Sequence, residues 1–192
     1  MSLDVLDWRR RTAALYELVR TELYPPVAHA GWVASREELF RTHPASPVTD
    51  AQYDLPVAPY DPQWRAEVAL EAAPRQRIEV PSGTDGVVPF ERLGVLRTPW
   101  GDLDAWWLAS YGGGVWVPVR DRTSGGTSYG GGRYLLDTVK GADLGSTADC
   151  RLVLDLNFLY APSCAHDEAW ACPLAPPGNV LDVEVTAGEQ LH

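Results

Sequence analysis

Residues 103–119, LDAWWLASYGGGVWVPV, decide the fold class. The two-residue period of a β-strand runs through positions 103–110 and resumes at 115–119, so that alternate side chains share one face. The YGGG sequence at 111–114 separates the two halves and has the composition of a tight turn. This stretch therefore predicts a β-hairpin, in which the second strand runs antiparallel to the first.

Further strand patterns lie on both sides of this hairpin, at residues 78–80, 87–98, 133–139, 150–160 and 179–186. The pattern is clearest at 150–160, where alternate residues form an unbroken apolar face: Cys150, Leu152, Leu154, Leu156, Phe158 and Tyr160. Of the 17 glycines, only Gly31 precedes Gly83, so the glycines belong to the turns between these strands. Several short strands with glycine-rich turns predict a mostly antiparallel sheet that is curled into a barrel or sandwich.

The chain begins differently, with helical periodicity. Apolar residues recur at steps of three and four through residues 4–23, and Pro25 and Pro26 end this predicted helix. A second helix is predicted over 27–42, ended by the His43-Pro44 pair. Residues 44–76 are rich in proline but also in aromatic residues, which favours an ordered wrapping segment over a flexible linker.

These patterns predict an α+β protein, with N-terminal helices packed on the mostly antiparallel sheet. We expect residues 1–192 to form a single domain, because 192 residues suit one hydrophobic core. Its parts would be a helical region (1–43), the wrapping segment (44–76) and a β-rich core (77–192).

Composition excludes several classes of protein. The chain has 16 basic and 26 acidic residues and a net charge of −10, which argues against a nucleic-acid partner and against a polybasic membrane-surface protein. We expect no membrane partner, because no run approaches the roughly 18–20 apolar residues of a membrane-spanning helix. No secretory signal begins the sequence, and its three cysteines are an odd number, so we expect reduced thiols in the cytoplasm. A Cys164–Cys172 bridge is the alternative for an exported protein.

Two groups of residues are candidates for a site. Asp155 and Asn157 lie two positions apart in a predicted strand and so share a face, which either faces water or lines a pocket. Cys164, His166 and Cys172 carry the donor atoms of a zinc site, but their spacing matches no standard zinc motif. Buried thiols in an ordered loop are the preferred interpretation, and no metal and no cofactor are predicted.

The segment DRTSGGTSYGGGR at 121–133 is rich in glycine, which suits tight turns or a close approach to a ligand. It is followed by a strand-like sequence and not by the Lys-Ser/Thr and helix of a phosphate-binding loop. A match to the G-x-S-x-G motif of serine hydrolases at 126–130 lacks the strand and helix on either side that this motif needs. Neither nucleotide binding nor serine hydrolysis is therefore predicted from this segment.

Several motifs, in order along nearly the whole chain, carry a family resemblance. They are REELFRTHPASPV (36–48), PYDPQWR (59–65), RTSGGTSYGGGRYLLDT (122–138), LVLDLNFLYAPSCAHDEAWACPLAPPGNVL (152–181) and TAGE (186–189). The chain resembles the domain of unknown function 1684 family of uncharacterised bacterial proteins. The resemblance is imperfect at Leu156, Leu159, Ala161 and Ser128, where the family usually has other residues. It implies no reaction, because no activity is established for the family.

The resemblance implies which residues recur in the family. Many of these positions hold a polar residue or glycine, and such residue types suit a ligand-binding pocket. We predict a small-molecule-binding, β-barrel-like domain with a polar pocket for a small anionic ligand, lined by Arg133, Tyr129, Asp155, Asn157 and Thr123. Arg133 would pair with the anion, and Asp155 would accept protons. One alternative is an enzyme with Asp155 or Asp121 as base. The other is a structural domain in which these residues form a buried network that fixes the turns. The oligomeric state is not predicted.

Overall fold

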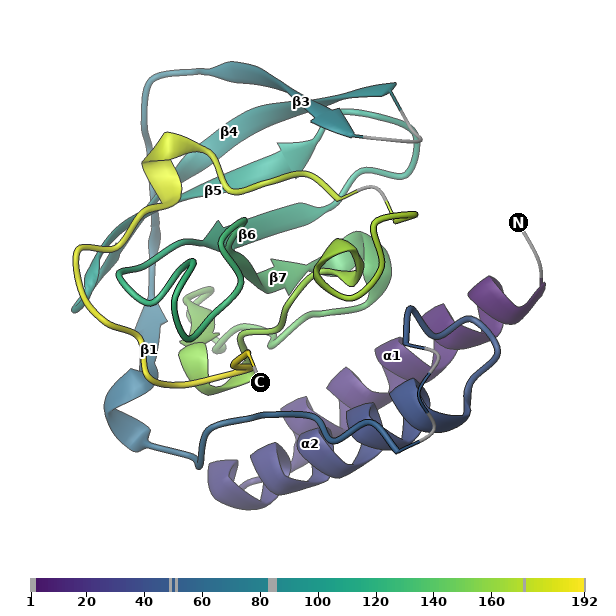
Figure 1. The fold of residues 1–192 in the computed structure, drawn as a ribbon. Helices are drawn as coiled ribbons and strands as arrows, with labels where there is room; N and C mark the ends of the chain where they lie inside the picture. Colours follow the sequence, from purple (N-terminus) through teal and green to yellow (C-terminus); the bar gives the residue numbers. More distant parts are fainter. Residues whose placement is uncertain (1–2, 49, 51, 83–85, 171, 192) are drawn as a thin grey trace.

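The computed structural model describes residues 3–48, 50, 52–82, 86–170 and 172–191. Its first two elements are the helices α1 (Leu3–Thr21) and α2 (Pro25–Thr42), which lie side by side as a hairpin (Figure 1). Pro25 and Pro26 occupy the first turn of α2, where a missing backbone N–H costs nothing and the fixed φ angle favours a helix. Both predicted helices are confirmed, although the second starts two residues before its predicted start.

The larger sheet has six strands, and all of its pairings are antiparallel. Its strand order is β2-β4-β5-β6-β7, with β3 also paired to β4. The strands are β2 (Leu70–Glu71), β3 (Arg77–Ser82), β4 (Gly86–Thr98), β5 (Gly101–Leu108), β6 (Val115–Val119) and β7 (Arg133–Asp137). The predicted hairpin is confirmed, because Trp106 pairs with Trp116 and Trp107 with Val115 across β5 and β6.

A second, two-stranded sheet joins β1 (Arg65–Val68) to β8 (Leu152–Asp155). In this pairing Arg65 lies opposite Asp155, and Val68 lies opposite Leu152. The proline-rich segment thus contributes β1 and β2 before position 77, where the β-rich part was predicted to begin. It is ordered through a short 3-10 helix, η1 (Pro62–Trp64), that the Asp61 side chain caps by accepting a hydrogen bond from the Gln63 backbone.

The predicted strand at 150–160 is wrong in its length. Strand β8 ends at Asp155, and a 3-10 helix, η3 (Leu156–Phe158), follows it. The Asp155 side chain accepts a hydrogen bond from the backbone N–H of Asn157, which bends the chain out of the extended conformation. The side chains of Leu154, Leu156 and Phe158 are buried all the same, whereas Cys150 is exposed, so the predicted apolar face is buried only in part and did not require one continuous strand.

The predicted final strand at 179–186 is also wrong. The chain forms the 3-10 helix η5 (Pro177–Asn179) there and then continues irregularly, with a single parallel bridge between Val180 and Arg120. Backbone hydrogen bonds join residues 120 and 122 to residues 179, 181 and 183, and side chains hold the segment beyond them. The backbone N–H of Val185 donates to Oδ1 of Asp121, and the carbonyl of Val185 accepts from Arg133.

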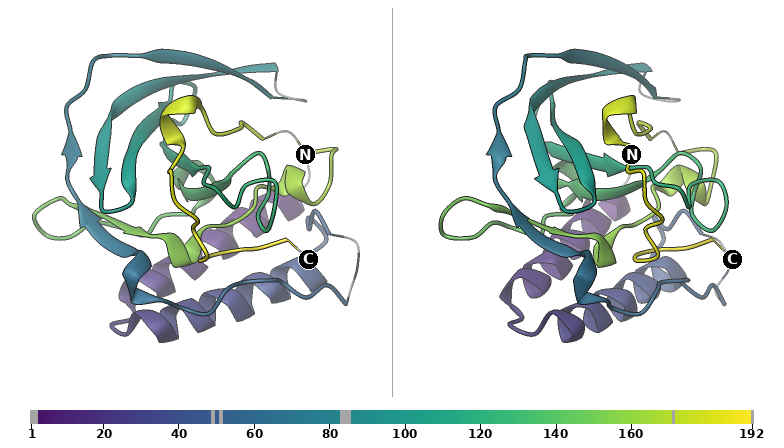
Figure 2. Two further views of the ribbon diagram at one scale, coloured as in Figure 1. Left: turned by 60° about the vertical axis from the view of Figure 1, so that its left-hand side comes forward. Right: turned by 90° about the vertical axis from the view of Figure 1, so that its left-hand side faces the viewer.

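The large sheet curls strongly, as both views in Figure 2 show, but it does not close into a barrel. Among the described residues no pairing joins β7 back to β2 or β3. Core side chains fill its hollow, including the stacked rings of Phe90 and Trp116, 4.5 Å apart. The helical hairpin contacts η3 through α2, where Trp32 lies 5.5 Å from Phe158 between ring centroids. The chain is therefore α+β with an open, curled antiparallel sheet.

Candidate functional site

Arg133, predicted to bind an anion, is engaged inside the protein. Its residue surface is 1% exposed, and its Nη2 forms an ion pair of 2.9 Å with Oδ2 of Asp121. The guanidinium also donates to three backbone carbonyls of the C-terminal segment, those of Val185, Ala187 and Glu189, at 2.6–3.0 Å. Four internal acceptors thus surround one buried cation, which fixes the turns at 185–189.

Thr123 belongs to the same cluster, whereas Tyr129 does not. The backbone N–H and the hydroxyl of Thr123 both donate to Oδ1 of Asp121, at 2.8 and 2.6 Å. The Thr123 hydroxyl also contacts the hydroxyl of Ser128 at 2.8 Å. The Tyr129 hydroxyl lies 3.8 Å from the sulfur of Cys164, and burial raises its pKa to about 12. Tyr129 therefore stays protonated at neutral pH and contacts a different part of the chain.

Asp155 and Asn157 form a separate cluster with the segment that precedes β1. The Asn157 side-chain amide donates to Oδ1 of Asp155 (2.7 Å) and to the carbonyl of Asp61 (2.9 Å), and its oxygen accepts from the Asp61 backbone (2.9 Å). Nε2 of His29 lies 3.1 Å from the Asn157 carbonyl oxygen. Asn157 therefore joins α2, the Tyr60–Asp61 region and β8.

The structure does not gather the five predicted binding residues around one pocket. Arg133 and Thr123 lie with Asp121, Asp155 lies with Asn157, and Tyr129 lies beside Cys164. The physical reason is the division of the strands, because Arg133 starts β7 of the large sheet whereas Asp155 ends β8 of the small one. Of these residues, Asp155 borders an open cavity.

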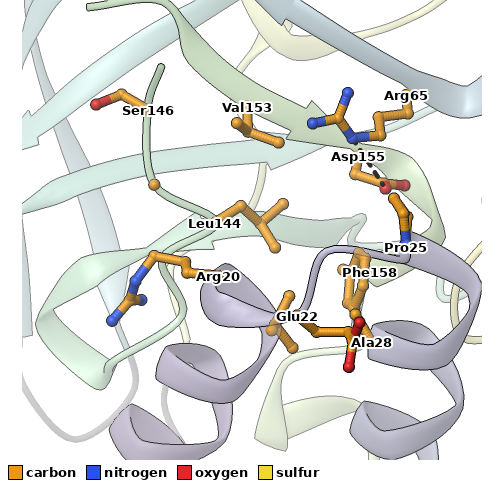
Figure 3. Close-up of a pocket in the computed structure, with 12 residues that line it drawn as sticks. Arg20, Glu22, Pro25, Ala28, Arg65, Leu144, Ser146, Val153, Asp155 and Phe158 are labelled. Carbon is orange, nitrogen blue, oxygen red and sulfur yellow. Dashed lines mark ion pairs between the residues drawn. The ribbon is translucent and has the colours of Figure 1, made fainter. Parts of the chain in front are cut away.

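This cavity, the Arg65–Asp155 cleft, has a volume of about 240 Å³. It lies where the end of α1 and the start of α2 meet the small sheet. Figure 3 places Arg65 and Asp155 together at one end of the cleft and Arg20 at the other. Charged and polar side chains (Arg20, Glu22, Arg65, Ser146 and Asp155) share the lining with apolar ones (Val19, Pro25, Ala28, Leu144, Val153 and Phe158). A mixed lining of this kind suits a small molecule with a charged end and an apolar body.

The two oxygens of Asp155 have different surroundings. Oδ1 accepts two hydrogen bonds from Asn157, at 2.7 and 3.1 Å. Oδ2 has longer contacts, a hydrogen bond of 3.3 Å from the Tyr60 hydroxyl and a distance of 4.0 Å to Nε of Arg65. A 4.0 Å separation is too long for a direct hydrogen bond. Oδ2 therefore keeps the capacity to accept a hydrogen bond from a ligand.

Burial governs the charge of this carboxyl group. Asp155 is 2% exposed, and burial raises its pKa, while the hydrogen bonds from Asn157 and the charge of Arg65 act in the opposite direction. The Arg65 side chain is 33% exposed, and its Nη2 donates to Oε1 of Glu67 at 3.0 Å. A guanidinium has five N–H donors, so Arg65 can hold Glu67 and still bind an anion.

The raised pKa of Asp155 predicts a specific pH dependence. The carboxyl is more readily protonated in the folded than in the unfolded chain, so its contribution to stability is complete below its ordinary pKa of 3.8. This contribution is lost as the pH rises through the folded-state pKa. The unfolding free energy of the wild type should therefore fall relative to that of Asp155→Asn as the pH rises above 3.8 and through the raised folded-state pKa. Urea denaturation of both proteins at several pH values measures this difference.

Asp182→Asn is the matched control for that measurement, because the Asp182 side chain is 91% exposed. The inferred burial of the charge would be contradicted if the difference in unfolding free energy between the wild type and Asp155→Asn stayed constant with pH. A difference that shifts in favour of the wild type as the pH rises would contradict it as well.

The candidate zinc ligands are not arranged as a metal centre. In the part of the chain that the structure describes, no three His, Cys, Asp or Glu side chains are placed to hold a metal ion. The His166 ring packs on Phe40 and Tyr53, at centroid distances of 5.1 and 5.8 Å. The two cysteines lie instead beside Tyr129.

Sequence reasoning missed Tyr60, Asp61 and Arg65 as partners of the Asp155 cluster. All three belong to the PYDPQWR motif, so the presence of this motif in the family resemblance was the signal that could have pointed to them. Glu189 lies in the TAGE motif, but no role was predicted for it. Its carboxylate forms an ion pair with Arg36 and accepts a 2.7 Å hydrogen bond from the Ala161 backbone, which ties α2 to the C-terminal segment. The backbone of residue 161 makes this contact, so the contact does not depend on the side chain there.

Fold and cleft together define an α+β protein, with an open curled sheet and a charged cleft beside its helical hairpin. The chain belongs to the family described as Protein of unknown function (DUF1684), whose model matches residues 52–190. Asp155 and Arg65 lie inside the matched region, whereas Arg20 and Glu22 precede it. The predicted family resemblance is thus confirmed.

The structure is similar to the solution NMR structure of an uncharacterized protein of Haloarcula marismortui. The two chains are 29% identical, the match covers 83% of this chain and 90% of the other, and the TM-score is 0.56. No curated protein matches the chain. In the described residues, no helix combines the length and the apolar character that crossing a membrane requires.

Proposed function

We propose that the protein binds a small anionic molecule in the Arg65–Asp155 cleft. The observation that carries this proposal is the pairing of a buried carboxyl oxygen, Oδ2 of Asp155, with an arginine 4.0 Å away at the end of a cavity. The two groups are too far apart to form a direct hydrogen bond with each other. A ligand between them would accept hydrogen bonds from Arg65 with its anionic group and donate one to Asp155 from a second group.

The lining restricts the chemistry of the ligand. Arg65 favours a carboxylate or phosphate, which a guanidinium can bind in a bidentate manner. Asp155 favours a hydroxyl or amine that donates a hydrogen bond. Leu144, Val153 and Phe158 provide apolar contacts, and a volume of about 240 Å³ suits a molecule smaller than a typical drug. A short hydroxy acid combines these features. We propose that the protein binds this ligand in the cytoplasm.

A second candidate function is acid–base catalysis in the same cleft. The raised pKa of Asp155 favours it, because burial brings a carboxyl group closer to the range in which it exchanges protons at neutral pH. Asp121, the other candidate base, receives hydrogen bonds from Arg133, Thr123 and the Val185 backbone, which supports a structural role instead.

Isothermal titration calorimetry with 3-hydroxybutyrate and butyrate tests the proposal. Wild-type protein should bind the hydroxy acid more tightly than butyrate, which lacks the hydroxyl group for Asp155. Arg65→Gln should weaken binding of 3-hydroxybutyrate by about 10- to 100-fold, because a hydrogen bond to a charged group contributes roughly 1.5–3 kcal/mol.

Arg77→Gln is the matched control, because Arg77 is an exposed arginine on β3 whose partner Glu91 is equally exposed. It should bind 3-hydroxybutyrate as the wild type does. Equal weakening in Arg65→Gln and Arg77→Gln, or no measurable binding of either acid by the wild type, would refute this ligand class.

A further inference from the structure

A second cavity lies at one end of the curled sheet. Most of its lining comes from the first half of β4, the start of β6 and the ends of β5 and β7, which lie at the same end of an antiparallel sheet. Helix α1 and the 3-10 helix η2 (Thr138–Lys140), which directly follows β7, contribute the charged part of the lining. This cavity, the Phe90–Trp116 cavity, has a volume of about 170 Å³, and no described residue lines both it and the Arg65–Asp155 cleft.

Aromatic and aliphatic side chains form the walls of the Phe90–Trp116 cavity. The rings of Phe90 and Trp116 are stacked, with an interplanar angle of 28°. Val88 and Leu108 add aliphatic surface to the same lining. An apolar cavity of about 150 Å³ in another protein is large enough to bind benzene. A volume of about 170 Å³ therefore fits one six-membered ring.

The Trp116 indole brings a hydrogen-bond donor that lacks an acceptor. Its Nε1 is buried and forms no hydrogen bond with any residue that the structure describes. Trp106, which lies opposite Trp116 in the pairing of β5 with β6, donates instead from its Nε1 to Oδ1 of Asn179 at 2.8 Å. A buried donor without an acceptor costs free energy. This lining therefore favours a ring that carries an oxygen substituent over a plain hydrocarbon.

The charged residues of the cavity favour a negative substituent. Arg9 and Lys140 both belong to the lining, although the net charge of the chain is −10 and Lys140 is its only lysine. Arg9 is exposed and forms no ion pair with the part of the chain that the structure describes. Nζ of Lys140 lies 3.4 Å from Oδ2 of Asp137, which is the one acidic residue in the described lining. The two cations thus exceed the single carboxylate by one positive charge.

We propose that the Phe90–Trp116 cavity binds a single-ring aromatic carboxylate such as benzoate. The ring packs against Phe90 and Trp116, and the carboxylate interacts with Arg9 and Lys140. One carboxylate supplies both an oxygen acceptor and the negative charge that the lining favours. Because Lys140 already pairs with Asp137, Arg9 provides the positive charge that no described side chain neutralises. This proposal does not depend on the ligand of the Arg65–Asp155 cleft, because neither Arg65 nor Asp155 lines this cavity.

The single lysine allows a direct test by NMR. Reductive methylation with ¹³C-formaldehyde labels Lys140 and the N-terminal amine, and it keeps the positive charge of both groups. The signal that is missing from Lys140→Gln belongs to Lys140. Titration of the labelled wild type with benzoate should shift this signal to saturation. A Lys140 signal that stays unchanged, or that drifts without saturating, would overturn the proposal, whatever the signals of the cleft residues do.

Two other ligands test which features of benzoate matter. Acetate lacks the ring, and benzylamine has the opposite charge. Both should bind roughly tenfold or more weakly than benzoate, because burial of the ring and the charge of the carboxylate each contribute to the affinity. If acetate bound as tightly as benzoate, the site would hold an adventitious ion only. If benzylamine bound as tightly as benzoate, Asp137 and not Arg9 would select the ligand, which would contradict the proposal.

Arg9→Gln tests the role of the unpaired cation. It should raise the benzoate concentration at half-saturation by about 3- to 10-fold, because a charge-assisted contact at an exposed arginine is lost. Arg10→Gln is the matched control, because Arg10 is also exposed and follows Arg9 on α1 but does not line the cavity. It should bind benzoate as the wild type does. Equal effects of the two substitutions would contradict the assignment of Arg9 to this site.

Discussion

Arg133→Ala should lower the unfolding free energy by about 3–5 kcal/mol, which is a large part of the total stability of a protein this size. The substitution removes a cation that is 1% exposed and leaves the Asp121 carboxylate buried without its ion-pair partner. It also removes the donors of three backbone carbonyls in the C-terminal segment. Truncating one member of a buried ion pair costs more than the pair contributes, because the remaining charge is uncompensated.

Arg122→Ala is the control for this substitution. Arg122 pairs with Asp182 at the same distance, 2.9 Å, but the two side chains are 59% and 91% exposed. An exposed ion pair contributes less than about 1 kcal/mol, so this variant should keep nearly all of the wild-type stability. Guanidinium denaturation, monitored by tryptophan fluorescence, measures the unfolding free energy of both variants. Similar small losses in the two variants would show that the Arg133 cluster does not hold the C-terminal turns.

Gly188→Ala should be the second most damaging change, with a loss of about 3 kcal/mol. Gly188 has a φ angle of +75°, in the left-handed region that a residue with a Cβ rarely adopts. A Cβ atom there would lie 2.6 Å from the Leu159 carbonyl oxygen and 2.7 Å from the Leu159 Cβ. Neither neighbour can move freely, because the Leu159 carbonyl accepts the Glu189 backbone hydrogen bond and the Leu159 side chain is buried.

Gly31→Ala is the same chemical change, but we expect it to have the opposite effect on stability. Gly31 lies within α2, and a Cβ atom at this position would have no neighbour within 4 Å. Alanine is favoured over glycine in a helix by up to about 1 kcal/mol, so this variant should be slightly more stable than the wild type. The same denaturation curves measure both glycine variants. A Gly188→Ala protein as stable as Gly31→Ala would contradict the close packing of the C-terminal segment.

Much of the fold could be predicted from local patterns. The helical hairpin followed from the apolar repeats of three and four and from Pro25 and Pro26, and the central hairpin followed from alternation around the YGGG turn. Local periodicity failed where hydrogen bonds from side chains fix the path of the backbone. Asp155 caps a 3-10 turn in the middle of the apolar run at 150–160, and Arg133 binds the carbonyls of a segment that was predicted to be a strand.

The candidate site could be predicted only in part, because its residues meet across long separations. Asp61 and Asn157 are 96 positions apart and Arg36 and Glu189 are 153 apart, yet each pair is in direct contact. No periodicity links such positions. The recurring motifs contained one or both members of these contacts, but motif membership does not say which residue contacts which. Arg133 and Asp155 were therefore assigned to one pocket, although they belong to different sheets.

Binding in the Arg65–Asp155 cleft is the central claim, and chemical-shift mapping by two-dimensional ¹H–¹⁵N NMR tests it most directly. Titration with 3-hydroxybutyrate should shift the backbone signals of cleft residues such as Ser146 and Val153 to saturation, in the wild type and in Arg77→Gln. The same titration of Arg65→Gln should leave these signals nearly unchanged. Shifts confined to residues outside the cleft, or shifts at Ser146 and Val153 that survive in Arg65→Gln, would contradict the claim.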